Sequence, residues 1–209
     1  FPVNTVSLIR PNEEGAKWTW GEPSPGTKRP GMQGPIDDAF LSRFLVVAPD
    51  HLPEEDKMAR WLDFELTHFR ERWRTLMRGD LPEKSADEVD SDDIATANLI
   101  LWGDPRSNPL IAEIAERLPV RWQDGSFTLR GQTYASNAHI PVLIFPNPLN
   151  PDRYVVLNSG LTFREGHDRT NSLQNPKLPD WAVIGLDRDP DALAPGRIVE
   201  AGFFNESWE

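Results

Sequence analysis

The chain has no cysteine among its 209 residues, which excludes disulfide bonds, thiolate metal sites and a cysteine nucleophile. It has no apolar run of the roughly 20 residues that a membrane-spanning helix needs, and no basic-then-apolar signal segment. Basic residues are outnumbered, because 22 Lys and Arg stand against 33 Asp and Glu, for a net charge of −11. We therefore expect neither nucleic acid nor a membrane as a partner.

Motifs for the common catalytic and cofactor chemistries are also missing. There is no Gly-x-Ser-x-Gly nucleophile elbow, no phosphate-binding Walker loop and no dinucleotide-binding glycine pattern. The histidines do not form the i, i+4 pair of zinc enzymes, and the acidic run 87–93 lacks the glycine and terminal glutamate of a calcium loop. We expect no metal and no cofactor, and we interpret the acidic run as a solvated connector. The four histidines are His51, His68, His139 and His167.

The segment 98–108 organises the rest of the chain. Its apolar run 99–102 is typical of a strand covered on both faces, and Gly103 allows a sharp turn where the strand ends. Ser107 or Asn108 can cap a following helix that has Pro109 in its first turn. Polar residues at the carboxyl end of a buried strand occupy the usual ligand position of open α/β sheets.

Apolar strands alternate with amphipathic helices along the chain. Residues 53–78 are predicted to form the longest helix, and we interpret His68 and the arginines of 70–74 on its flank as solvent-exposed. Asp124 and Gly125 predict a β-hairpin. Further strands are predicted at 44–48, 139–145, 154–157 and 181–186, and a second helix at 110–118. The fold class that follows is α/β: a three-layer α/β/α sandwich with a mixed, mostly parallel sheet and a β-hairpin insertion.

Two regions are expected. Residues 28–209 form the α/β domain, and residues 1–27 are the remnant of a preceding β-rich region with a Pro/Gly linker. Because the chain begins with Phe1 rather than Met, we expect this point to mark a cut between domains or a processing site.

The candidate site consists of polar residues that follow two predicted strands. If those strands run parallel and close together, their loops would enclose a pocket. Ser159, which is followed by a glycine and lies eight residues before His167, is the catalytic candidate with that histidine. The alternative interpretation is that these side chains only cap helices and close turns. The ligand-binding candidates are Asp104, Ser107, Asn108, Asn158, Ser159, Arg164 and Glu165.

Several segments together resemble a known C-terminal region: 31–40 (GMQGPIDDAF), 98–105 (NLILWGDP) with 107–108, 146–151 (PNPLNP) and 155–160 (VVLNSG). That region follows the catalytic domain in large bacterial proteins of the prolyl-oligopeptidase and α/β-hydrolase esterase families, including carbohydrate-esterase-like members. The resemblance covers residues 28 to the end. It implies a secreted or periplasmic protein whose partner is the preceding catalytic domain. It transfers no catalytic residue, because the triad of those proteins lies in that preceding domain.

Three functions stay open at this point. The first is an accessory, non-catalytic domain of a secreted esterase or peptidase, which packs on the hydrolase or positions a carbohydrate or ester substrate. The second is an esterase-type hydrolase or small-ligand binder that uses the loops 103–108 and 158–167. The third is a carbohydrate-binding module that uses surface tryptophans such as Trp18 and Trp20. Whether the chain is an enzyme is thus left undecided.

Overall fold

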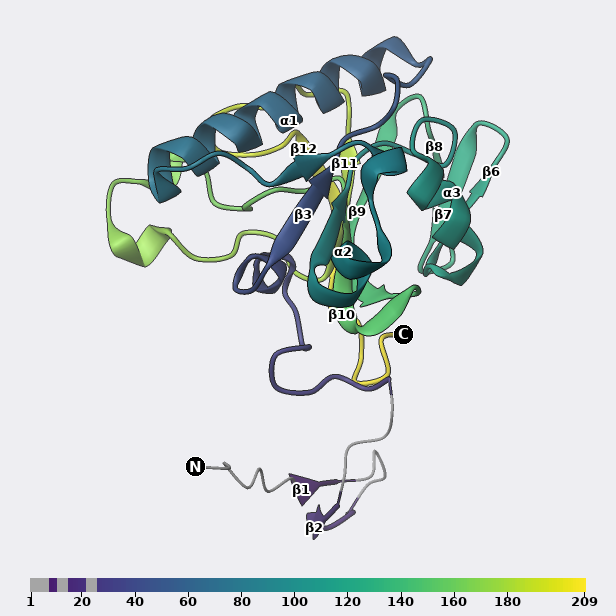
Figure 1. Ribbon diagram of the computed structural model, residues 1–209, viewed down its shortest axis with the longest axis vertical. Helices are drawn as coiled ribbons and strands as arrows, with labels where there is room; N and C mark the ends of the chain where they lie inside the picture. Colours follow the sequence, from purple (N-terminus) through teal and green to yellow (C-terminus); the bar gives the residue numbers. More distant parts are fainter. Residues whose placement is uncertain (1–7, 11–14, 22–25) are drawn as a thin grey trace.

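The computed structural model describes residues 8–10, 15–21 and 26–209. Its centre is a seven-stranded sheet in the order β12-β11-β9-β10-β5-β3-β4 (Figure 1). The bounds of these strands are β3 (Phe44–Val47), β4 (Glu83–Lys84), β5 (Asn98–Leu101), β9 (His139–Asn147), β10 (Asn150–Leu157), β11 (Trp181–Gly185) and β12 (Arg197–Gly202).

The predicted mixed sheet is confirmed, but the sheet is half antiparallel rather than mostly parallel. The pairs β4/β3, β3/β5 and β5/β10 are parallel, while β10/β9, β9/β11 and β11/β12 are antiparallel. The connection between β9 and β10 explains much of the difference, because it is too short for a helical crossover and so forces an antiparallel pair.

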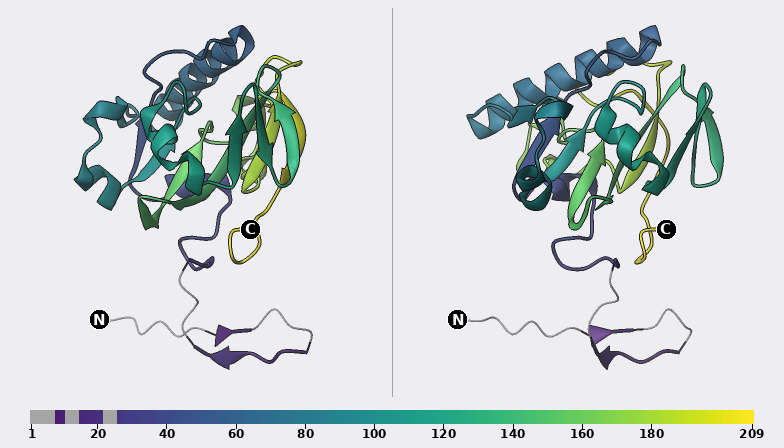
Figure 2. Two further views of the ribbon diagram at one scale, coloured as in Figure 1. Left: turned by 90° about the vertical axis from the view of Figure 1, so that its right-hand side faces the viewer. Right: turned by 45° about the vertical axis from the view of Figure 1, so that its right-hand side comes forward.

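The helices are fewer and shorter than a clear three-layer α/β/α sandwich requires, so that part of the fold prediction is wrong. Among the helices of the described residues, only α1 (Asp56–Met77) is long, whereas α2 (Ser91–Thr96) and α3 (Pro109–Ile114) have six residues each. Between β5 and β9 the chain forms a three-stranded antiparallel sheet of β6 (Val120–Gln123), β7 (Ser126–Leu129) and β8 (Gln132–Ala135) instead of a long helix. In Figures 1 and 2, α1 crosses the large sheet, and α2, α3 and the small sheet lie apart from α1.

The hairpin predicted at Asp124 is confirmed as the turn between β6 and β7, and β8 extends it. The helix predicted over 110–118 is shorter, since α3 ends at Ile114 and a 3-10 turn continues to Arg117. Other 3-10 turns cover Ile36–Phe40, Ala86–Glu88, Glu165–His167 and Asn171–Leu173.

The core lies between α1 and the centre of the sheet. The residues of the predicted buried run 99–102 are all at most 1% exposed. The rings of Trp61 and Phe69 on α1 lie 6.4 and 6.3 Å from the ring of Trp102. Aromatic side chains of this size supply a large share of the buried apolar area, so this contact fixes α1 on the sheet.

The start of the predicted α/β domain is tied to the end of the chain. The backbone N–H of Lys28 donates to the carbonyl of Glu206, and its ammonium lies 2.5 Å from Asp180 and 4.9 Å from the ring centroid of Trp208. Of the predicted preceding region 1–27, residues 1–7, 11–14 and 22–25 lie outside the described residues. The described part contains the strand pair β1 (Leu8–Ile9) and β2 (Thr19–Trp20), which lies apart from the large sheet (Figure 1). No helix within the described ranges is long and apolar enough to cross a bilayer.

Candidate functional site

The two loops of the predicted site do leave the same edge of the sheet. β5 and β10 are parallel neighbours, with Leu101 opposite Leu157. The Asn158 side chain accepts a hydrogen bond from the Gly103 N–H (2.8 Å) and donates to the Gly103 carbonyl (3.0 Å). The structure therefore brings the two loops together, and the Asn158 side chain joins them through these two hydrogen bonds.

The loop 103–108 is closed by its own side chains. Asp104 Oδ1 accepts from the N–H groups of Arg106 and Ser107 and from the Ser107 hydroxyl, at 2.8 to 3.0 Å. Asn108 caps α3 by accepting from the Leu110 N–H at 3.0 Å, and Ser107 and Asn108 are fully buried. These hydrogen bonds are those of an Asx turn and a helix cap, so these side chains hold the loop in shape.

The catalytic candidates do not meet. The Ser159 hydroxyl donates to the carbonyl of Gly160 at 3.0 Å, and His167 Nδ1 accepts from the Arg164 N–H at 3.0 Å. Within the described chain no hydrogen bond joins Ser159 to His167. Desolvation, followed by the nearby positive charges of Lys177 and Arg164, lowers the pKa of His167.

Arg164 and Glu165 instead turn toward α1. The guanidinium of Arg164 pairs with the carboxylate of Glu65, and both side chains are less than a tenth exposed. Glu165 Oε2 lies 2.8 Å from Nε2 of His68. Sequence reasoning placed His68 on a solvated flank and missed Glu65. The helical spacing of these two residues with the buried Trp61 and Phe69 was the available signal.

A cleft of about 960 Å³ opens beside this pair, between α1 and the loop 186–190 that follows β11. Among the ligand-binding candidates, Glu165 lines the cleft and the other six do not. The lining residues are Lys57, Arg60, Trp61, Asp63, Phe64, Thr67, His68, Glu71, Glu165, Leu186, Asp187, Arg188, Asp189 and Pro190.

Two rings of α1 lie in the cleft. The ring planes of Phe64 and His68 are within 8° of parallel, with centroids 6.1 Å apart, and Phe64 is 43% exposed. Lys57, Arg60 and Asp189 also line the cleft, and their side chains make no hydrogen bond or ion pair with other described residues. The cleft thus offers an apolar ring surface beside donors and acceptors of both charge signs.

The pKa values of Glu65 and Glu165, two carboxyl groups at the cleft, are shifted in opposite directions. Burial raises the pKa of Glu65, although the charge and hydrogen bond of Arg164 oppose the rise. Burial also acts to raise the pKa of Glu165, but the hydrogen bond from His68 and the charges of His68 and Arg72 hold it below its ordinary value. Glu165 is therefore the ionised partner of His68 at neutral pH.

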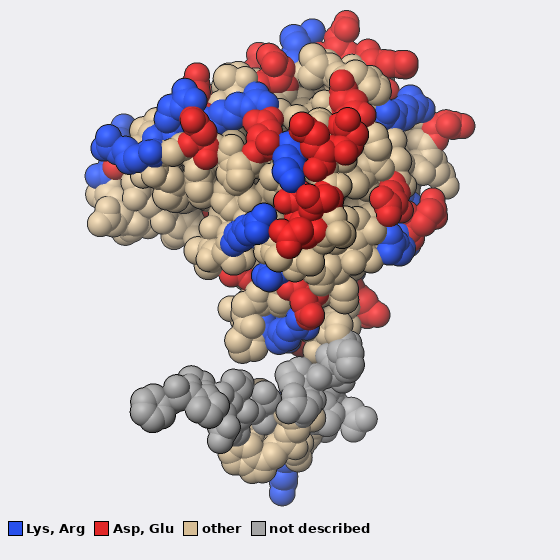
Figure 3. Space-filling model, viewed as in Figure 1, with Lys and Arg blue, Asp and Glu red and all other residues tan. Residues whose placement is uncertain are grey.

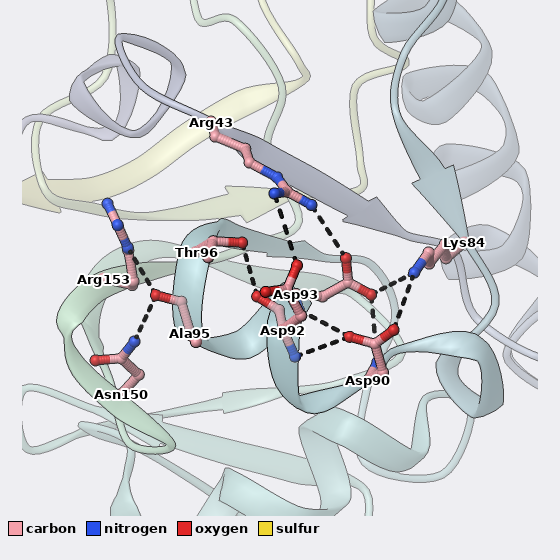
Figure 4. Close-up of polar contacts among 9 residues, drawn as sticks. All are labelled: Arg43, Lys84, Asp90, Asp92, Asp93, Ala95, Thr96, Asn150 and Arg153. Atoms are coloured by element: carbon pink, nitrogen blue, oxygen red, sulfur yellow. Dashed lines mark hydrogen bonds and ion pairs between the residues drawn. The ribbon is translucent and has the colours of Figure 1, made fainter.

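The acidic segment before β5 has a structural use. Asp90 caps α2 by accepting from the N–H groups of Asp92 and Asp93, and Asp93 accepts from Lys84 and lies 3.5 Å from Arg43 (Figure 4). The acidic run 87–93, interpreted from sequence as a solvated connector, therefore contains a helix start and ion pairs. The described residues contain no group of three or more His, Asp or Glu that could hold a metal ion.

The face shown in Figure 3 carries both basic and acidic side chains, and basic side chains gather over one end of α1.

Comparisons with protein-family models, with curated proteins and with solved structures find no match to this chain.

Proposed function

We propose that this chain is an accessory domain of a secreted or periplasmic hydrolase of the esterase or peptidase class, and that its α1 cleft holds a carbohydrate part of the substrate. Its partner is the catalytic α/β-hydrolase domain that precedes it in the parent protein. The segments that resemble the region after such catalytic domains support this assignment: 31–40, 98–105 with 107–108, 146–151 and 155–160. So does the lack of a hydrogen bond between Ser159 and His167 in the described chain, where each side chain has a backbone partner instead.

The parallel rings of Phe64 and His68 in the cleft are the observation that carries the proposal. The C–H face of a sugar packs on an exposed aromatic ring, while its hydroxyls both donate and accept hydrogen bonds. Lys57 and Arg60 supply donors, and Asp189 supplies an acceptor, without breaking any hydrogen bond or ion pair within the described chain. A wall with both charge signs suits a neutral, polyhydroxylated ligand better than a strongly charged one.

Affinity electrophoresis in gels containing xylan, glucomannan or β-glucan tests this proposal. We expect at least one polysaccharide to retard the wild-type chain, and Phe64→Ala to weaken the retardation about tenfold, which corresponds to roughly 1.4 kcal/mol of lost stacking. Phe203→Ala is the matched control, because Phe203 is 67% exposed and lies outside the cleft lining. A wild-type chain that no polysaccharide retards, or a Phe64→Ala variant that binds normally, contradicts the proposal.

The exposed tryptophans at the β1/β2 strand pair support a second candidate. Trp18 and Trp20 are 64% and 74% exposed, so they could form the sugar platform of a carbohydrate-binding module. In the same gels, loss of retardation in Trp18→Ala or Trp20→Ala, with Phe64→Ala unaffected, would assign binding to these tryptophans. Hydrolysis of p-nitrophenyl acetate that Ser159→Ala abolishes would instead favour an esterase.

A further inference from the structure

We propose that Arg164 is a positioning residue that holds the two walls of the α1 cleft at a fixed separation, and so controls its affinity for a glycan. This inference rests on the proposed function, since it names the side chain on which the shape of that binding site depends.

Two buried side chains connect the walls. The indole N–H of Trp61 on α1 donates to the Pro195 carbonyl, and Arg164 contacts both walls at once. Arg164 is 3% exposed, and its guanidinium pairs with Glu65 on α1. The same guanidinium donates to the carbonyl of Asp191 at 2.7 Å, and Asp191 directly continues the opposite wall, 186–190. The planar guanidinium, with donors on separate nitrogens, can make both contacts at once, which a lysine ammonium cannot do with the same fixed geometry.

The far wall is rigid enough to be positioned as a unit. The Asp191 carboxylate accepts from the N–H groups of Leu193 and Ala194 at 2.7 and 2.9 Å and pairs with Arg188 at 2.5 Å. The neighbouring 3-10 turn docks on this wall, because the Gly166 N–H donates to the Ala192 carbonyl at 2.9 Å. A displacement of Asp191 would therefore move the segment 188–194, which these contacts join.

Stability alone does not account for the buried pair. Glu65 Oε1 has no hydrogen-bond partner among the described residues, so the carboxylate is incompletely satisfied. Replacing a buried ion pair by apolar side chains of similar size is often neutral for stability or even stabilising. The double variant Glu65→Leu/Arg164→Met therefore removes the link to Asp191 without leaving an unpaired buried charge.

The matched control removes another pair between α1 and the same region. Arg72 donates to both oxygens of Asp168 at 2.8 and 2.9 Å, and neither residue lines the cleft. The variant Arg72→Met/Asp168→Leu therefore loses an ion pair of α1 but keeps the contacts of Arg164 with Glu65 and Asp191.

Two readouts separate this inference from the proposed function. The first is glycan affinity in the polysaccharide gels, which we expect to fall at least fivefold in Glu65→Leu/Arg164→Met and to stay unchanged in the Arg72→Met/Asp168→Leu control. The second needs no ligand: hydrogen exchange of the amides of 186–195 should become faster in Glu65→Leu/Arg164→Met, while exchange in α1 stays as in the wild type. Faster exchange with no glycan binding by any chain would contradict the proposed function and leave the positioning role supported.

Arg164→Lys keeps the proposal testable if the double variant does not fold. It retains a cation for Glu65 and loses the fixed contact with Asp191, so we expect faster exchange of 186–195 and weaker binding in a folded protein. If Glu65→Leu/Arg164→Met folds and shows wild-type affinity and exchange, the positioning role is wrong. If neither variant folds, Arg164 serves folding, and the inference is equally overturned.

Discussion

Asn158 closes the gap between two parallel strands by pairing its side chain with both backbone groups of Gly103, at 2.8 and 3.0 Å. A second donor contact joins the same amide to the Pro141 carbonyl at 3.2 Å. Asn158 also has a φ of 53°, a left-handed conformation that asparagine tolerates better than most residues. The residue thus links β5, β9 and β10 at the point where the sheet changes from parallel to antiparallel.

We predict that Asn158→Ala lowers the free energy of unfolding by roughly 3 kcal/mol, because each buried backbone group that loses its partner costs about 1–3 kcal/mol. Asn158→Gly removes the same hydrogen bonds but relieves the backbone strain, so its loss should be smaller. Urea denaturation measures both. Asn175→Ala, at an exposed position, is the control and should stay within about 0.5 kcal/mol of the wild type. Equal stability of Asn158→Ala and the control would contradict this role.

Leu101→Asp is expected to abolish folding. Leu101 is fully buried in β5, between β3 and β10, and an unpaired charge there costs several kcal/mol of the roughly 5–15 that hold a domain together. Asp104→Ala removes only the acceptor of an Asx turn, so we expect a loss of about 1 kcal/mol. Circular dichroism during thermal unfolding distinguishes the two. A cooperative transition for Leu101→Asp near the wild-type temperature would show that β5 is misplaced.

The central strands and α1 could be predicted from sequence because their signals are local. A continuous apolar run such as 99–102 has to be buried, and the apolar spacing of Trp61, Leu62, Leu66 and Phe69 has the period of a helix. The hairpin at Asp124 has an equally local signal in its turn residues. The boundaries were less exact, since α1 begins at Asp56 rather than Pro53.

The cleft could not be predicted, because its chemistry depends on partners that are distant in sequence. His68 pairs with Glu165, 97 residues away, and Glu65 pairs with Arg164, 99 residues away. A single sequence shows a charged helix flank and a polar loop, and nothing local connects them. The predicted polar loops had clear local signals, but those signals describe caps and turns as well as they describe a ligand site.

We predict that Gly160→Ala is destabilising by about 1–3 kcal/mol, since a methyl group there would lie 2.4 to 2.9 Å from carbons of the Phe69 ring. Gly79→Ala is the control, because nothing lies within 4 Å of its added Cβ and it has no positive φ. That change should be neutral or stabilising by up to about 1 kcal/mol. Phe69→Leu in the Gly160→Ala background should recover part of the loss. Urea denaturation in which both glycine variants behave alike would contradict the packing of α1 on this turn.

The last prediction concerns acid stability of the loop after β11. Hydrogen bonds from the Leu193 N–H, the Arg188 side chain and the Ala194 N–H lower the pKa of Asp191 from 3.8 to about 2. Because the pKa is lower in the folded state, the contribution of Asp191 is fully present above pH 3.8 and is lost as the pH falls toward 2. We therefore expect Asp191→Asn to lower the melting temperature at pH 6 and to show a smaller further drop than the wild type between pH 4 and pH 2. Asp189→Asn is the control, because it removes the same charge from the same loop at a side chain without a hydrogen-bond or ion-pair partner in the described chain. Its melting temperature should fall between pH 4 and pH 2 by as much as that of the wild type. Equal drops in all three proteins would mean that Asp191 does not hold the loop.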